Sequence, residues 1–323
     1  MFITMDLSPW ETLRSYHSTE TVQRRLQANY HNLSLKNPSG LAYDNSYRFV
    51  YFLKHGENFF KQAQSSPTAI QPILLFYGLS QLLKASTLSV DPEYPSTSSV
   101  LAHGVSSRKR KKQQYHFLKD EVKVQKNGLF SHVAFHLFHM KHTEFDKYSM
   151  DFLLSQVAEM KDLYLFHQNK SILVDIKVEN AIMTIPTNIA DLYHMTPDRL
   201  KEYLLGLNSS LSPLQAEDHK EIISLKVKGP LQPFSCAPYI FQLEKNTYSL
   251  PTSRDMLSTI PELLIHYLIL YNLSMISRYE TDWWYDLLLN TNSDDYPFIL
   301  RYLEVVKRKI PYYTQLFLQS TLG

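Results

Sequence analysis

The sequence predicts an α+β protein in which helices dominate: a helical bundle built from the N- and C-terminal segments, with a small β-containing region between them. Three observations support this fold class. Apolar residues recur at helical spacing toward both ends of the chain, whereas residues 121–126 and part of 171–185 alternate between apolar and polar. Glycine is scarce, at 8 of 323 residues, which disfavours an all-β fold rich in tight turns.

The first helix is expected to begin at Ser8. Ser8 can cap it, Pro9 suits the first helical position, and Glu11 completes a capping box. A rough helical stripe then continues to about Tyr30, after which Asn-Pro-Ser-Gly at residues 37–40 interrupts the chain.

Two further helices follow in the N-terminal third. One is expected at residues 46–63, and Ser66-Pro67 begins the next. Pro72 must lie in or near the first turn of that helix, because a proline deeper inside would break it. Residues 73–83 are apolar nearly all round, which is typical of a helix buried in the middle of a bundle.

The middle of the chain is expected to contain the strands. Asn127-Gly128 stands between the alternating run 121–126 and an apolar segment that begins at Leu129, a pattern that predicts a β-hairpin. Beyond it we expect a helix at about 149–165, a short helix beginning at Thr196, and strands within 171–185, 222–227, 239–243 and 248–250.

The C-terminal part is predicted to be helical again. Its expected helices are 261–278, 282–289, 296–309 and 311–321. Pro297 and Pro311 are expected to mark boundaries between them. The chain therefore divides into an N-terminal helical region (1–118), a mixed middle region (119–260) and C-terminal helices (261–323) that pack on the first region in one compact unit.

Composition limits the classes of function. The 33 basic and 31 acidic residues give a net charge of +2, so no global field favours nucleic acid. One cysteine, Cys236, excludes an internal disulfide and fits a reducing compartment. The N-terminus does not resemble a signal peptide, and the most apolar stretch, 263–276, is too short to span a bilayer. We expect a cytoplasmic protein that does not associate with membranes.

Common catalytic signatures are missing from the sequence. It contains no GxSxG, P-loop, GxGxxG or kinase motif, so we expect no cofactor, and whether the protein is an enzyme stays open. Cys236 has no basic neighbour in the sequence to activate it and is interpreted as structural.

Several polar and aromatic residues border segments that are expected to be buried. The candidate ligand-binding residues are Tyr77, Lys84, His103, Arg278, Glu280 and Trp283. Burying charge is costly unless it is paired or recognises a ligand, so the pattern suggests an anion site with an aromatic lining. The alternatives are a lysine that complements a helix dipole, a hydrogen-bonded histidine in a turn, and an Arg278–Glu280 ion pair.

Four histidines, His132, His136, His139 and His142, are spaced four, three and three residues apart. On one helix they would share a face, and two of them could bind zinc. The expected hairpin instead puts His132 on a strand and divides the set, so no metal site is predicted.

Five basic residues form a run: Arg108, Lys109, Arg110, Lys111 and Lys112. Beside Gln113, Gln114 and Tyr115, the run could bind a nucleic-acid backbone. The alternative is that the run is a solvated loop.

Taken together, four segments resemble the YaaC-like protein family: residues 76–85 (FYGLSQLLKA), 102–105 (AHGV), 127–130 (NGLF) and 273–280 (LSMISRYE), the last followed by Trp283. The resemblance extends over most of the chain. It implies a bacterial cytosolic protein and does not imply an activity.

The third helix also resembles helical domains of the HEPN type, many of which are ribonucleases or nucleotide-binding modules. Such ribonucleases carry an arginine and a histidine with four to six residues between them. Arg48 with His55, and Arg110 with His116, fit that spacing, but neither pair lies on a late helix of the bundle.

The leading hypothesis is a binding or regulatory protein that recognises a phosphorylated or nucleotide-like ligand. The alternatives are a HEPN-like ribonuclease or nucleotide-processing enzyme, and a structural scaffold that binds a partner. The candidate partners are a nucleotide or RNA, together with a second copy of the chain. The leading hypothesis requires that Lys84 and Arg278 converge in space.

Overall fold

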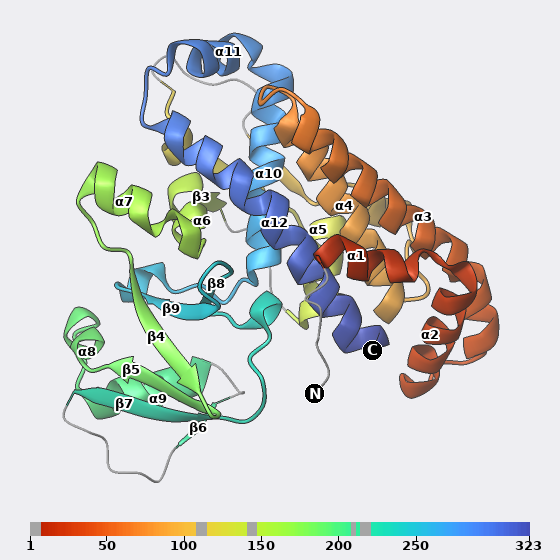
Figure 1. Cartoon of the computed structure of the whole chain (residues 1–323), viewed down its shortest axis with the longest axis horizontal. Coiled ribbons are helices and arrows are strands. Elements are labelled where there is room, and N and C mark those ends of the chain that lie inside the picture. The colour runs from red at the N-terminus through yellow and green to blue at the C-terminus, as the bar shows by residue number, and fades with distance from the viewer. Residues whose placement is uncertain (1–7, 108–114, 141–146, 208–210, 214–220) are drawn as a thin grey trace.

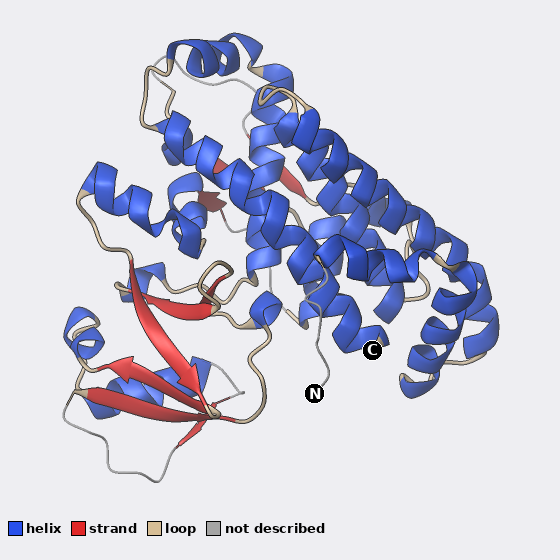
Figure 2. Cartoon of the chain, in the orientation of Figure 1, coloured by secondary structure: helices blue, strands red, loops and turns tan. Residues whose placement is uncertain are grey.

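A computed structural model describes residues 8–107, 115–140, 147–207, 211–213 and 221–323. The described residues form 12 α-helices and two antiparallel sheets, so the predicted helix-dominated α+β class is confirmed (Figure 1). Figure 2 shows the larger sheet gathered at one corner of the molecule, while helices fill most of the rest.

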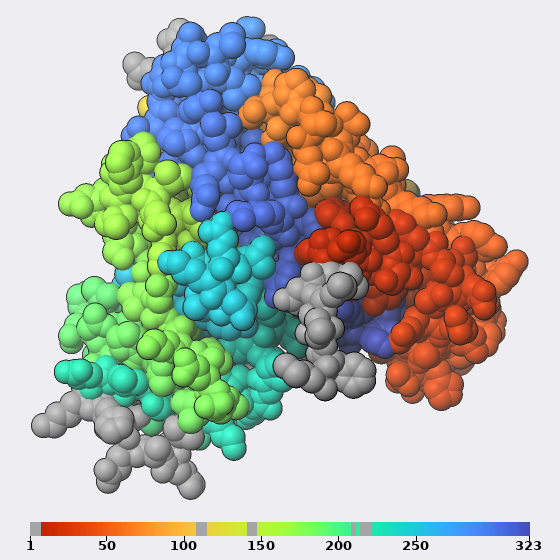
Figure 3. Space-filling view, in the orientation of Figure 1, coloured from red at the N-terminus to blue at the C-terminus, as the bar shows by residue number. Residues whose placement is uncertain are grey.

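The bundle combines helices from both ends of the chain. Its members are α1 (Pro9–Arg14), α2 (Thr19–Asn32), α3 (Pro38–Ser65), α4 (Gln71–Val90), α10 (Glu262–Tyr279), α11 (Thr281–Asn290) and α12 (Asp295–Leu322). Helix α4 packs against α3, α10 and α12, and α1 also contacts α12. The two ends of the chain therefore meet on one face, as Figure 3 shows.

Helices α4 and α10 form the centre of this bundle. Residues 262–274 of α10 are all buried, and α4 buries side chains on every side, including Leu75, Phe76, Leu79 and Leu82. The α4 window is long and apolar enough to cross a membrane, with a mean hydropathy of 1.3, but 67% of it is buried inside the protein. That burial is typical of the core helix of a soluble protein.

A three-stranded sheet of order β1-β2-β3 lies against α10. Its strands are β1 (Val105–Ser107), β2 (Glu121–Val124) and β3 (Lys147–Ser149). Helix α5 (Leu129–Phe138) lies between β2 and β3 in the chain. Helices α6 (Met150–Ser155) and α7 (Lys161–Gln168) follow β3.

The second sheet has six strands in the order β6-β7-β5-β4-β9-β8. Its strands are β4 (Leu173–Glu179), β5 (Ile182–Pro186), β6 (Leu211–Pro213), β7 (Ile222–Val227), β8 (Ile240–Gln242) and β9 (Thr247–Pro251). Helices α8 (Asn188–Leu192) and α9 (Pro197–Leu207) accompany it at the lower left of Figure 1. The β4–β5 turn puts Asn180 and Ala181 at positive φ, 51° and 61°, as a tight type I′ hairpin requires.

Local signals located several helix ends correctly. The capping box between Ser8 and Glu11 is present, and Pro72 lies at the start of α4. The first helix does not run to Tyr30 without a break, because it is divided at residues 15–18, and Pro38 begins α3 rather than merely ending the preceding segment.

Three further expectations were wrong. The helix expected at about 149–165 is divided into α6 and α7, with a short 3-10 helix at Ala158–Met160 between them. Leu129 begins helix α5, so Asn127-Gly128 is not a hairpin turn, and β2 pairs with β1 and β3 instead. Pro311 lies inside α12 and does not divide it. A proline removes one backbone donor from a helix, and here both flanking halves are held by buried residues, among them Ile310 and Tyr313.

A buried ion cluster joins the bundle to the six-stranded sheet. The Nζ atom of Lys309, on α12, lies 2.7 Å from Glu159 Oε2 and 2.6 Å from Glu262 Oε1. It also donates to the Phe241 carbonyl of β8 at 2.6 Å, and the Tyr313 hydroxyl donates to the second oxygen of Glu262 at 2.7 Å. The Lys309 side chain is 0% exposed, so protein groups rather than solvent compensate its charge.

The Glu262 carboxylate and the Lys309 ammonium hold each other in the charged state. Burial alone would lower the pKa of Lys309, but Glu262 and Glu159 outweigh that effect and keep the pKa above its usual value. Burial would raise the pKa of Glu262, but Lys309 and His266 keep it low. Removing one member would leave buried charge without compensation.

Lys309→Met should therefore reduce the free energy of unfolding by about 3–5 kcal/mol, because it leaves two buried carboxylates facing each other. The matched control is Arg308→Ala on the same helix, whose half-exposed pair with Glu244 at 2.6 Å should contribute less than about 1 kcal/mol. Urea denaturation of both variants measures the difference. Equal losses would show that the cluster does not stabilise the fold.

Candidate anion-binding site

Helices α4 and α10 carry three of the predicted residues on neighbouring faces. Tyr77 and Lys84 are seven residues apart on α4, two helical turns that span about 10 Å. Arg278 lies in the last turn of α10, where its Nε donates to the Ser274 carbonyl of its own helix at 3.0 Å. Its Nη1 donates to the Tyr77 hydroxyl at 3.4 Å, so the two helices are linked at this point.

His103 completes the group from the segment that precedes β1. Its ring centroid lies 5.0 Å from that of Phe76, 6.2 Å from Tyr77 and 5.9 Å from Tyr271. The backbone of His103 is fixed as well, because its carbonyl accepts a hydrogen bond from the buried Tyr267 hydroxyl at 2.9 Å. The imidazole is therefore held within an aromatic wall made by α4 and α10.

The pKa of His103 reflects burial and the positive charge of two basic side chains. Burial lowers the pKa of His103, and the positive charges of Arg278 and Lys84 lower it further. Burial also lowers the pKa of Lys84, whose Nζ lies 5.8 Å from the Phe52 ring centroid. Both cations thus act on the same imidazole, which favours its neutral form.

Neither cation is neutralised by a carboxylate in the part of the chain that the structure describes. The ion pairs between described residues include neither Lys84 nor Arg278, although both side chains are partly buried. Partly buried positive charge without a counter-charge is a favourable environment for an anion. Tyr77, Lys84, His103 and Arg278 are hereafter called the cationic cluster.

Glu280 and Trp283 contact a different set of residues. The Trp283 ring packs edge-on against Tyr115 at 4.7 Å, and the Tyr115 hydroxyl donates to Asp120 at 2.8 Å. Burial, Asp120, Asp295 and Glu280 all raise the pKa of Tyr115. These two candidates therefore belong to an acidic neighbourhood next to the cationic cluster, and no Arg278–Glu280 ion pair forms between these described residues.

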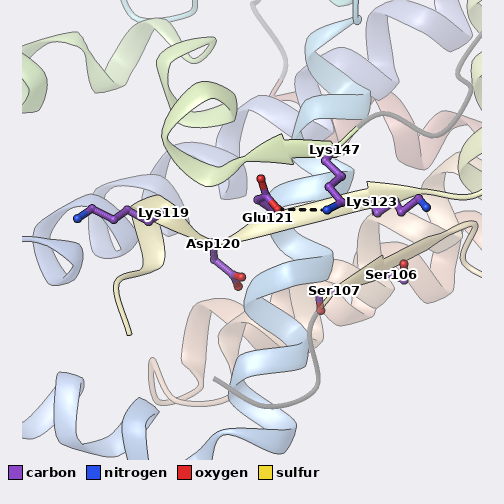
Figure 4. Close-up of a pocket in the computed structure, with 7 residues that line it drawn as sticks. All are labelled: Ser106, Ser107, Lys119, Asp120, Glu121, Lys123 and Lys147. Carbon is purple, nitrogen blue, oxygen red and sulfur yellow. Dashed lines mark ion pairs between the residues drawn. The ribbon is translucent and has the colours of Figure 1, made fainter. Parts of the chain in front are cut away.

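A polar cavity of about 250 Å³ adjoins this acidic neighbourhood (Figure 4). It is lined by Ser106, Ser107, Lys119, Asp120, Glu121, Lys123 and Lys147, all from the small sheet or the turn before β2. Lys147 pairs with Glu121 at 3.8 Å, so the cavity wall contains both basic and acidic groups. The basic run Arg108, Lys109, Arg110, Lys111 and Lys112 follows Ser107 directly and lies outside the described residues.

The Arg/His pairs of the HEPN-type spacing lie outside the cationic cluster. Arg48 donates to the Asn45 side chain at 2.8 Å and to the Tyr94 carbonyl at 2.6 Å, and His55 packs on Phe59 at the surface. Arg110 lies outside the described residues, while the exposed His116 is 4.0 Å from Asp295.

A second constellation is formed by Asp91, His132 and His136, of which sequence reasoning named the two histidines, set them aside as a metal site, and missed Asp91. The wrong hairpin prediction separated the two histidines, which α5 places one turn apart. Their four-residue spacing was visible in the sequence and fits a helix, but no local pattern pointed to Asp91.

Two glycines determine where His103 lies. Gly104 and Gly128 have φ of 76° and 132°, and a Cβ on Gly128 would lie 2.3 Å from the Gly104 backbone. This contact lets Leu129 donate to the Ala102 carbonyl at 2.7 Å and Phe130 donate to the His103 carbonyl at 3.2 Å. The AHGV and NGLF segments therefore fit together because neither glycine has a side chain.

Gly128→Ala should lower the free energy of unfolding by at least about 1–3 kcal/mol, since the new methyl group meets backbone and the positive φ is strained. Gly206→Ala is the control: it lies in helix α9 with open space around its Cβ, and should be neutral or stabilise by up to about 1 kcal/mol. Thermal unfolding of the two variants gives the comparison. A Gly128→Ala protein as stable as the wild type would refute the close-contact explanation.

Comparison with known proteins adds one finding. The profile of the YaaC-like protein family matches residues 14–318, which include helices α2 to α11, most of α12, both sheets and the cationic cluster. No curated protein and no solved structure matches the chain at the significance required. Since the family profile spans nearly its whole length, the chain belongs to the YaaC-like protein family.

Proposed function

We propose that the cationic cluster binds a phosphorylated or nucleotide-like ligand, and that the protein acts by binding or regulation. The observation that carries the proposal concerns Lys84 and Arg278. Both are partly buried cations that lower the pKa of the His103 imidazole, and neither has a carboxylate partner among the described residues. Lys309 is the contrasting case within the same fold, because two carboxylates compensate it. A phosphate group would supply the missing negative charge.

The aromatic surroundings favour a ligand with a flat organic part as well as a charge. Tyr77 stacks on Phe59 at 6.1 Å, and the Arg278 guanidinium lies 5.3 Å from the centroid of the exposed Tyr279 ring. Rings of this kind stack on nucleobases in many binding sites. Arginine suits the phosphate because its planar fork can donate two parallel hydrogen bonds.

The proposal includes a cytoplasmic location. It is supported by Cys236, a buried free thiol whose pKa is raised by burial, and by the buried position of α4. The ribonuclease alternative has less support among the described residues, because Arg48 is committed to hydrogen bonds that hold the Pro92–Tyr94 segment to α3.

A titration with ATP, GTP, AMP and inorganic phosphate tests the proposal on the full chain. We expect at least one of these compounds to raise the melting temperature, because binding to the folded state alone stabilises it. Arg278→Gln and Lys84→Met should each weaken that binding about tenfold or more, since each removes a charged partner.

The controls are Arg24→Gln and Lys54→Met, which remove the same charges from exposed positions outside the cluster. Their affinities should stay within about twofold of wild type, apart from weak long-range electrostatics. If none of the four compounds binds, or if the Arg278 and Lys84 variants bind as well as the controls, the proposal fails. RNA cleavage that is lost in His103→Ala would favour the enzyme alternative instead.

A further inference from the structure

We propose that Asp91, His132 and His136 form a binding site for one divalent transition-metal ion of the zinc class. The three side chains come from two elements: Asp91 follows the last residue of α4, and the histidines lie one turn apart on α5. Their potential ligand atoms all lie within 4.8 Å of one another. This site is separate from the cationic cluster and does not depend on the proposed function.

The geometry at the carboxylate is the first argument. Asp91 Oδ2 lies 2.9 Å from His132 Nε2 and 3.9 Å from His136 Nε2, so two imidazole nitrogens converge on one oxygen. Only the shorter contact is a hydrogen bond. Ligand atoms around a tetrahedral zinc ion are separated by about 3.4 Å, which these three atoms can reach by small side-chain rotations.

The supporting structure is the second argument. The other carboxylate oxygen of Asp91 accepts a hydrogen bond from the Glu93 amide at 3.1 Å, and the Asp91 amide donates to the Thr87 carbonyl at 2.8 Å. The His132 ring lies 4.2 Å from that of His136 and 5.2 Å from that of the buried Tyr94. These hydrogen bonds and ring contacts orient the ligands before any ion binds, and such orientation strengthens metal binding.

Access is the third argument. A cavity of about 220 Å³ opens beside the two histidines, and its wall includes Ser131, Asn127 and Gly128. The side chains of Asp91, His132 and His136 are 13%, 11% and 30% exposed, so an ion can enter from solvent and still be partly shielded. Three protein ligands leave a fourth position free, and the cavity gives room there for water or for an oxygen of a bound molecule.

The choice of ion follows from the ligand chemistry. Two imidazoles and one carboxylate suit zinc, cobalt or ferrous iron, whereas magnesium and calcium prefer an all-oxygen environment. Of the other histidines in the sequence pattern, His139 is exposed and is not part of the three-residue group, and His142 lies outside the described residues.

Zinc titration of the EDTA-treated full-length protein tests the site, with Co²⁺ absorbance as a second readout of a tetrahedral ligand set. We expect one Zn²⁺ per chain and a rise in melting temperature on addition of Zn²⁺ alone. His136→Asn and Asp91→Asn should each weaken zinc binding by at least about 10–100-fold and abolish the cobalt spectrum, because each removes one ligand.

The matched control is His139→Asn, which should bind zinc like the wild type because His139 lies outside the three-residue group. Circular dichroism of the metal-free variants establishes that each one folds, and the partly exposed His136 makes that variant the less disruptive of the two. Absence of one-to-one binding to the wild type, or binding that survives both ligand substitutions, overturns the proposal. Arg278→Gln should leave zinc affinity unchanged, so failure of the anion site is distinguishable from failure of the metal site.

Discussion

The buried ammonium of Lys309 is the constraint on which the assembly of the two halves depends. It draws Glu159 and Glu262 together with the carbonyl of Phe241, and so joins α12, α10 and β8 through partners that lie 150, 47 and 68 residues away along the chain. An ion that is 0% exposed is stable only when all of these partners are in place. The bundle and the six-stranded sheet are thus fixed relative to each other by charge as well as by apolar packing.

The same principle separates structural charges from candidate functional ones. Lys309 is fully compensated, and Glu57 likewise pairs with Arg14 at 2.7 Å and Lys61 at 2.9 Å. Lys84 and Arg278 border the most apolar helices and have no such compensation among the described residues. The fold pairs its buried charges elsewhere, and these two cations both lower the pKa of His103, which is the basis for proposing an anionic ligand.

The contact between Gly104 and Gly128 connects the two proposed sites. On one side it positions His103 in the aromatic wall, and on the other it leads into α5, which carries His132 and His136. Gly128 also lines the cavity beside those histidines. Since α4 carries Lys84 and is followed directly by Asp91, the two sites share one helix and one pair of glycines.

The sequence by itself determined the fold class, the capped start at Ser8, the buried helices around Phe76 and Leu268, and strand 222–227, because these follow from local spacing and capping chemistry. It could also point to Lys84, His103 and Arg278, since charge beside apolar segments is visible in the chain. Tertiary structure alone decided that α5 is a helix rather than half of a hairpin, that Pro311 is tolerated, and that Glu280 and Trp283 face Tyr115. Those outcomes depend on contacts between distant segments, which outweigh local propensity once the core is formed.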